Sequence, residues 1–175
     1  MRKVILYIAA SLDGYIARTD GDIDWLSMVE TPGEDYGYAA FHETIDTVMM
    51  GRNTYEKVLS FGIPYPHSDK QSYIISRTLT SKISENIHFY GGNLTELITL
   101  LKQKEGKHIF IDGGAQFVHA LLQEKLIDEL IISTIPVLLG DGIRLFKEGF
   151  LEQKLQLLSV QSFGSGLVQA HYAVQ

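Results

Sequence analysis

Residues 48–54 have the types and spacing that bind a phosphate group. An apolar run ends at Gly51 and is followed by Arg52, a capping residue and Thr54, after which apolar residues recur at helical spacing. Glycine lets the backbone approach a ligand closely. The first turn of a helix offers unpaired N–H groups and a partial positive charge, and Arg52 adds a planar set of donors. The alternative for Arg52 is an ion pair with Glu56 at i, i+4.

Two further strand ends carry comparable residues. Gly113, Gly114 and Ala115 follow the apolar run 109–111, and Ser76-Arg77 closes the run 71–76. In open parallel sheets, ligands bind beyond the carboxyl ends of the strands. The agreement of these positions with Gly51 favours the phosphate role for Arg52 over the surface ion pair.

The elements that must position these residues alternate between strand and helix patterns. This alternation predicts an α/β fold with a mostly parallel sheet and helices on both faces. Gly164-Ser165-Gly166 predicts a tight turn, so the last two strands form an antiparallel hairpin. Residues 11–35 are rich in turn signals and are expected to form a long functional loop. Strands are expected at 4–10, 47–50, 71–76, 86–90, 107–112, 129–137, 155–163 and 167–174, and helices at 38–46, 53–60, from Asn93 onward and 115–125.

Composition limits the class of protein. The chain of 175 residues has no linker or repeat and is interpreted as one domain, 1–175. A net charge of −6 argues against a general nucleic-acid binder. The absence of cysteine excludes disulfides, thiolate catalysis and cysteine-ligated zinc, and no metal is expected.

Arg2 and Lys3 precede an apolar run that is interpreted as a buried strand, not a signal peptide. No run reaches the ~18 apolar residues of a membrane span, so a cytoplasmic protein is expected.

Five motifs occur in the order typical of one superfamily. They are Ala-Ser-Leu-Asp-Gly-Tyr-Ile-Ala at 10–17, Met-Gly-Arg-Asn-Thr-Tyr-Glu at 50–56, Ile-Ser-Arg at 75–77, Asp-Gly-Gly-Ala at 112–115 and Pro-Val-Leu-Leu-Gly-Asp-Gly at 136–142. The chain resembles the dihydrofolate reductase-like superfamily, and within it the reductase (C-terminal) domain of the bifunctional riboflavin-biosynthesis deaminase/reductase. This resemblance implies a three-layer fold with a central mostly parallel sheet, and NADPH as the cofactor.

The resemblance also implies where the cofactor contacts the chain. Gly51, Arg52 and Thr54 would lie at the adenosine 2′-phosphate, with Ser76 and Arg77 beside them. Gly113, Gly114 and Ala115 would lie under the pyrophosphate, and Ala10 and Ile16 would line the nicotinamide side. Two arginines near a dianionic 2′-phosphate favour NADPH over NADH.

Hydride transfer requires a proton source beside the substrate. Asp35, at the start of the first helix, is the first candidate, with stabilisation of that helix N-terminus as its alternative role. Asp13 is the second, with a turn at Asp13-Gly14 as its alternative. Trp25 could cover the substrate or anchor its loop. His42 could relay a proton or pack structurally, and Asp112 is interpreted as a strand-end capping residue.

The sequence therefore predicts an NADPH-dependent reductase of a small heterocycle. The resemblance implies 5-amino-6-(5-phosphoribosylamino)uracil as substrate. A dihydrofolate or pterin reductase and a non-catalytic NADPH-binding sensor are the alternatives. The acidic segment 22–26 lies where a phosphorylated substrate would require cations. A homodimer is expected through apolar edge strands at 129–137 and 167–174, because pairing covers such edges.

Overall fold

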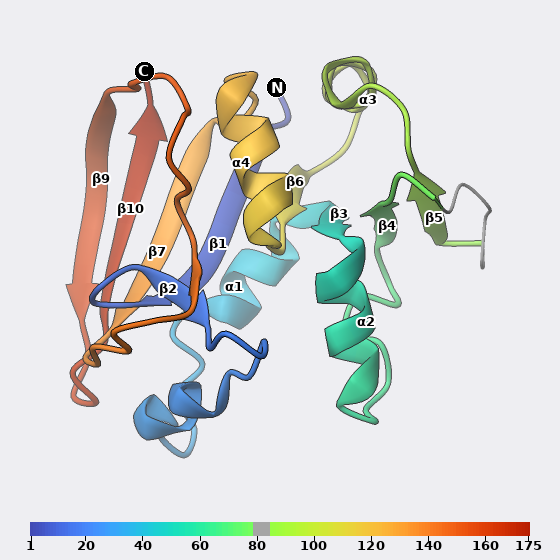
Figure 1. Ribbon diagram of the computed structural model, residues 1–175. Helices are drawn as coiled ribbons and strands as arrows, with labels where there is room; N and C mark the ends of the chain where they lie inside the picture. The colour runs from blue at the N-terminus through green and yellow to red at the C-terminus, as the bar shows by residue number, and fades with distance from the viewer. Residues whose placement is uncertain (79–84) are drawn as a thin grey trace.

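The computed structural model describes residues 1–78 and 85–175. Its main sheet has eight strands in the order β5-β4-β3-β6-β1-β7-β10-β9, which runs from right to left in Figure 1. The strands are β1 (Val4–Ser11), β3 (Ile45–Gly51), β4 (Gln71–Ile75), β5 (Ile87–Tyr90), β6 (His108–Ile111), β7 (Glu129–Ile135), β9 (Leu155–Ser162) and β10 (Val168–Val174). A separate pair joins β2 (Tyr15–Ala17) to β8 (Ile143–Arg144).

The pairing confirms the predicted α/β architecture. The six strands from β5 to β7 are parallel to their neighbours, whereas β10 pairs antiparallel with both β7 and β9. Gly166, at φ +87°, makes the turn of the final hairpin. Only glycine adopts this left-handed conformation without a steric penalty, so the Gly-Ser-Gly signal and the hairpin agree.

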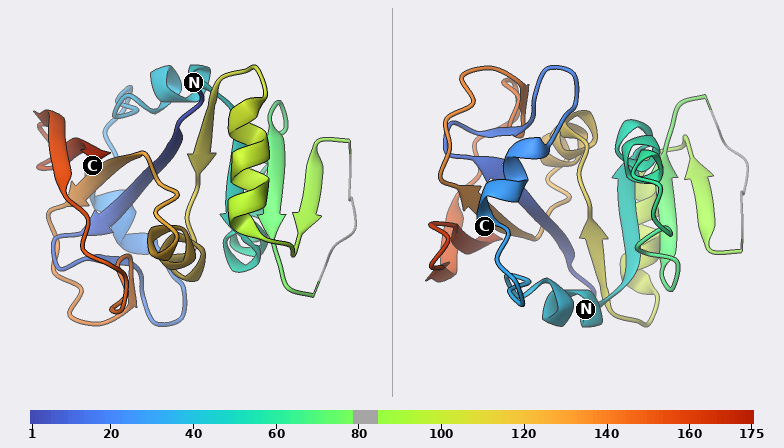
Figure 2. Two further views of the ribbon diagram at one scale, coloured as in Figure 1. Left: turned by 90° about the horizontal axis from the view of Figure 1, so that it is seen from above. Right: turned by 90° about the horizontal axis from the view of Figure 1, so that it is seen from below.

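Helices cover both faces of the sheet and give three layers (Figure 2). The central strands β1, β3 and β6 are largely apolar on both sides because each side meets a helix layer. On one face, α3 (Leu94–Gln103) and α4 (Ala115–Gln123) pack on residues such as Leu6 and Ile109. On the other, α1 (Tyr38–Glu43) and α2 (Arg52–Ser60) contribute Phe41 and Tyr55 to a cluster around Phe110.

Local signals placed most helix starts correctly. The Asn93 side chain caps α3 by accepting a hydrogen bond from the Glu96 backbone N–H at 3.1 Å. The interpretation of Asn53 as a cap is wrong, since α2 begins at Arg52 with Gly51 as its capping residue. The first helix is also shorter than expected. It ends at Glu43, because Ile45 is fully buried as the first residue of β3.

The segment 11–35 has more structure than the sequence predicts. It contains β2 and the 3₁₀ helix η1 (Asp24–Val29). The short strand β2 has a partner only because β8, more than 120 residues later, lies beside it. Such a non-local pairing leaves no local sequence signal.

The predicted sheet edges at 129–137 and 167–174 are wrong. In the sheet, β7 lies between β1 and β10, and β10 lies between β7 and β9. The edge strand next to them is β9, whose eight residues are all exposed. Among the residues that the structure describes, no helix is both long and apolar enough to cross a membrane.

Candidate functional site

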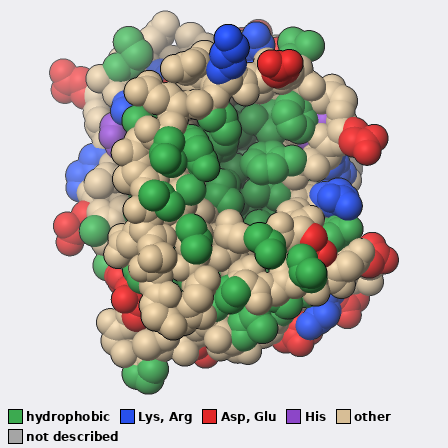
Figure 3. All heavy atoms as spheres, turned by 90° about the vertical axis from the view of Figure 1, so that its left-hand side faces the viewer, with side chains coloured by type: hydrophobic (Ala, Val, Ile, Leu, Met, Phe, Trp, Pro, Cys, Tyr) green, Lys and Arg blue, Asp and Glu red, His purple; other side chains and the backbone are tan. Residues whose placement is uncertain are grey.

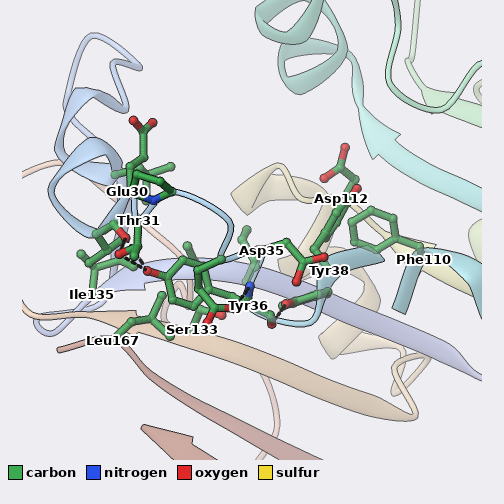
Figure 4. A pocket seen from close by; sticks show the side chains of 17 residues that line it. Glu30, Thr31, Asp35, Tyr36, Tyr38, Phe110, Asp112, Ser133, Ile135 and Leu167 are labelled. Atoms are coloured by element: carbon green, nitrogen blue, oxygen red, sulfur yellow. Dashed lines mark hydrogen bonds between the residues drawn. The ribbon is translucent and has the colours of Figure 1, made fainter. Parts of the chain in front are cut away.

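A cavity of about 780 Å³ lies where β1, β6 and β7 approach their carboxyl ends. This volume is typical of small-molecule sites. Its apolar wall is formed by Ile8, Ala9, Leu26, Val29, Ile135 and Leu167. Its polar groups are Tyr7, Tyr38, Ser133, Asp35 and Asp112, with Glu30 and Glu34 at the rim. Figure 4 shows Glu30 and Asp112 at opposite sides of the view, with Asp35 and Tyr38 between them.

Asp35 lines the cavity and also holds the start of α1. One carboxylate oxygen accepts a hydrogen bond from the Gly37 N–H and the other from the Ala39 N–H, both at 2.9 Å. The hydrogen bond from Ala39, followed by that from Gly37, lowers the pKa of Asp35. Asp35 is therefore an ionised acceptor at neutral pH rather than a proton donor, and its contacts favour the role of stabilising the N-terminus of α1.

Asp112 is the second acid of the cavity. Its Oδ2 lies 3.0 Å from Nε2 of His67, whose side chain is only 2% exposed. Its Oδ1 accepts no hydrogen bond from the residues that the structure describes. The Asp112 side chain remains 24% exposed and reaches the cavity. His67 thus fixes one oxygen of Asp112 and leaves the other for a ligand.

His67 is held by aromatic rings. Tyr65 and Phe110 meet it edge-on at centroid distances of 5.5 and 5.7 Å, and His42 stacks on it at 5.8 Å. Its Nδ1 is buried without a hydrogen-bond partner among the described residues. Burial lowers the pKa of His42. His42 stacks on His67 and does not itself line the cavity.

Raised pKa values keep the hydroxyl groups of two cavity tyrosines, Tyr38 and Tyr7, neutral. Burial, with the nearby charge of Asp112 as a second cause, raises the pKa of Tyr38 far above its usual value. Burial also raises the pKa of Tyr7, whose hydroxyl donates to the Tyr36 carbonyl at 2.9 Å and accepts from Gln169 at 2.8 Å. Gln169 also donates to Ser133 at 3.0 Å. These hydrogen bonds tie β10, β7 and β1 together and fix the cavity wall.

The predicted cofactor residues meet beside this cavity. The Gly51 N–H donates to the Gly113 carbonyl at 3.3 Å. A Cβ at Gly114 would lie 3.1 Å from Oγ1 of Thr54 and 3.5 Å from Cα of Gly51, and a Cβ at Gly113 would lie 3.1 Å from Ile8. Gly113 and Gly114 also have φ of +106° and +90°. The turns after β3 and β6 can approach this closely only because side chains are absent.

The two helix N-termini at this edge differ from that of α3. Both α2 and α4 start after a glycine and, within the described residues, have no side-chain cap, whereas Asn93 caps α3. Uncapped N–H groups at a helix start are donors for an anion. The residues present therefore fit the phosphate groups of a dinucleotide, since α4 opens at Ala115 directly after the uncapped turn at Gly114.

Arg52 lies between two strand ends. Its Nε pairs with Glu56 at 2.6 Å, so the i, i+4 contact forms, while its Nη1 donates to Oγ1 of Thr78 at 3.1 Å. Thr78 in turn donates its N–H to Oγ of the buried Ser76 at 3.3 Å. These contacts bring the start of α2 to the end of β4, beside the exposed Arg77. The Arg52 side chain is 41% exposed and remains open to a ligand.

Asp13 lies outside the cavity lining. It accepts hydrogen bonds from the Ser11 hydroxyl at 2.6 Å and from the N–H groups of Leu139 and Gly140 at 3.1 and 2.7 Å. The Ser11 hydroxyl, with the backbone N–H groups, lowers the pKa of Asp13 to about 2. These contacts favour the turn role over proton donation.

Three other predicted residues do not line the cavity. Trp25 is 4% exposed and packs with Val29, Ile135 and Leu167, so the structure favours its anchoring role. Ala10 and Ile16 pack in the cluster beneath α4. In the acidic segment 22–26, only Leu26 lines the cavity.

Sequence reasoning did not single out Tyr7, Tyr38 or His67 for the site and assigned Asp112 to capping. The signal for Asp112 was its position directly before Gly113-Gly114, because a residue at this strand end lies next to both the cavity and the start of α4. His67 lies in an irregular segment and reaches Asp112 from 45 residues away, so no local pattern indicates it.

Fold and site together define a reductase-like domain of the dihydrofolate reductase-like fold. The RibD C-terminal domain family model matches residues 2–169, and the chain belongs to that family. The uncharacterized protein YwjB of Bacillus subtilis (strain 168) is 45% identical over 171 residues, covering 98% of this chain and 97% of YwjB.

Solved structures agree with this assignment. A putative riboflavin biosynthesis protein from Shewanella sp. PV-4 is 36% identical, with a TM-score of 0.90 over 99% of both chains. A deaminase/5-amino-6-(5-phosphoribosylamino)uracil reductase from Thermotoga maritima has a TM-score of 0.73 at 14% identity, covering 99% of this chain and 57% of that one. The second likeness shows the fold alone. Membership in this family of reductases supports an oxidoreductase.

Proposed function

We propose that the protein is an NADPH-dependent reductase of a small heterocycle of the riboflavin-pathway type. One observation carries the proposal: β6 is followed directly by Asp112, which lines the cavity, and by Gly113-Gly114, which precede the uncapped N-terminus of α4. A single turn thus joins a binding pocket for a ring to a binding edge for phosphates.

When bound, NADPH supplies a hydride, that is, two electrons and one hydrogen nucleus. Reduction of a C=N or C=O bond also consumes one proton, so that the products are NADP⁺ and a substrate with two more hydrogens. Among the chain's own groups, Asp112 has an oxygen free to hold or transfer that proton, and Asp35 remains an ionised acceptor. The apolar wall excludes water from the ring.

We expect Arg52→Ala to weaken NADPH binding by about tenfold and to leave NADH binding unchanged. A charge-assisted hydrogen bond contributes roughly 1.5–3 kcal/mol, and only NADPH carries the 2′-phosphate. The dissociation constants of both nucleotides are measured by isothermal titration calorimetry.

Arg18→Ala is the matched control for this experiment. Arg18 is 44% exposed and pairs with Asp24, much as Arg52 at 41% pairs with Glu56. Its loss should change neither dissociation constant. Equal weakening of NADPH and NADH by Arg52→Ala would refute the 2′-phosphate assignment.

The substrate is tested by NADPH oxidation. 5-Amino-6-(5-phosphoribosylamino)uracil is the candidate that the names of solved relatives support. A pterin is the second candidate, favoured by Asp35, which presents an ionised carboxylate to ring N–H groups. Cofactor and ring binding without turnover would favour the non-catalytic sensor.

We also propose that the protein forms a homodimer through β9. This edge strand has no charged residue and exposes Leu155, Leu157, Leu158 and Val160. Figure 3 shows hydrophobic side chains gathered at the centre of this side of the molecule, with charged ones toward its periphery. An uncharged strand can pair with a second copy despite the net charge of −6, and an apolar centre with a polar rim is typical of interfaces.

Sedimentation should give twice the chain mass of 19.6 kDa. Leu157→Lys should shift the protein to monomer, because two lysines would then face each other across a buried seam. Leu100→Lys on α3 is the control, since both leucines are 52% exposed. A wild-type mass of one chain would refute the dimer.

A further inference from the structure

The acids of the cavity have no basic counterpart in its wall. The carboxylic acids that line the cavity are Glu30, Glu34, Asp35 and Asp112. No lysine or arginine is among the described residues that line it. Asp35 is held ionised by two backbone N–H groups. A ligand in this cavity therefore meets several acidic side chains and no basic one among the described lining residues.

Three arginines make their contacts outside the cavity lining. Arg18 donates to Asp24 at 2.7 Å. Arg144 lies over the Tyr15 ring, 4.7 Å from its centroid, and donates to its hydroxyl. Arg52 serves the edge beside Thr78. A phosphate or carboxylate on the substrate would meet groups of like charge in this cavity. It would find no cation to pair with among the described lining residues, and this opposes binding.

The rest of the wall suits a flat ring. Ile8, Val29, Ile135 and Leu167 supply apolar surface, and the aromatic side chains of Phe110 and Tyr38 also line the cavity. Asp112 and Asp35 stand on the side of the cavity near Tyr38 (Figure 4). Carboxylates accept hydrogen bonds from ring N–H and exocyclic amino groups, and these bonds are strong when the acceptor is ionised.

We propose that the substrate is an amino-substituted nitrogen heterocycle that carries no phosphate or carboxylate group. This inference rests on the proposed function for the identity of the site, and it narrows the substrate to a neutral or cationic ring. It departs from the phosphorylated substrate in the name of the Thermotoga maritima relative.

The test uses two pairs of ligands that differ in an anionic part. One pair is 5-amino-6-(5-phosphoribosylamino)uracil and its dephosphorylated nucleoside form, and the other is dihydrofolate and a dihydropterin without the glutamate tail. Binding to the full chain with NADPH present is measured by calorimetry and by the fluorescence of Trp25, which packs against wall residues of the cavity. NADPH oxidation is followed separately.

We expect the neutral member of at least one pair to bind at least tenfold more tightly than its anionic partner. Anionic members that bind equally or more tightly, or four ligands that all fail to bind, would overturn the inference. If neutral rings bind but NADPH is not oxidised, the substrate class stands and the reductase activity fails, so the two proposals are separated.

A charge-reversed variant tests the cause. Glu30→Lys at the cavity rim should reduce the preference for the neutral ligand at least threefold at low ionic strength. Glu124→Lys is the control with the same change in net charge, because Glu124 ends α4 and does not line the cavity. An equal effect of both variants, or no effect of Glu30→Lys, would show that the local charge does not select the ligand.

Discussion

Asp112→Asn is expected to lower kcat by about a hundredfold and to leave the affinity for NADPH within about twofold. Proton transfer by a positioned side chain contributes roughly 10²–10⁴ in rate, and asparagine has nearly the same shape but cannot transfer a proton. The Asp112 backbone N–H donates to Met49 at 3.0 Å, and this bond does not depend on the side chain. Turnover is measured with the neutral ligand that binds best, and NADPH affinity by calorimetry.

His67→Gln separates positioning from proton transfer. His67 touches Asp112 but does not line the cavity, so its loss should lower kcat by about tenfold and change the pH profile of kcat. A purely structural role would lower thermal stability and leave that profile unchanged.

Full activity of Asp112→Asn would refute the assignment of the proton to Asp112.

Arg2→Ala is expected to destabilise the fold by about 3 kcal/mol. Removal of one partner from a buried ion pair typically costs roughly 3–5 kcal/mol. The lower end of this range applies because Asp46, at 38% exposure, keeps some contact with water. Arg2 is 6% exposed and forms an ion pair with Asp46. It also donates to the carbonyls of Lys107 and Leu101 at 2.6 and 3.1 Å and to Oγ1 of Thr47 at 2.6 Å. Urea denaturation measures the loss.

Two controls accompany this variant. Arg2→Lys retains the charge but not the planar set of donors, so its loss should be intermediate. Arg18→Ala breaks an exposed pair with Asp24, and such pairs contribute roughly 0–1 kcal/mol. A loss for Arg2→Ala no larger than that for Arg18→Ala would contradict the role of Arg2 in joining β1, β3 and the segment after α3.

Arg2 also illustrates how far sequence reasoning reached. The run after Arg2 and Lys3 was interpreted correctly as a buried strand, and it forms β1. The sequence gives no indication that Arg2 itself is buried, because its partners lie 44 to 105 residues away.

The sequence by itself determined the features that depend on neighbouring residues. Apolar runs marked the strands, Asn93 marked the start of α3, and Gly51 and Gly113-Gly114 marked strand ends where the backbone must pass closely. These signals are local, since strand pattern, helix capping and a positive φ are set within a few residues. The fold and the close approach of the turns after β3 and β6 were predictable for this reason.

Only the tertiary structure decided which residues share the cavity and which strand lies at the edge. Asp112 joins His67 from 45 residues away, and Asp13 binds the backbone at Leu139 and Gly140 instead of entering the site. β9, rather than β7 or β10, is exposed because β10 inserts between β7 and β9. Such contacts depend on the order in which distant strands pair, and that order is set by the packing of the whole sheet.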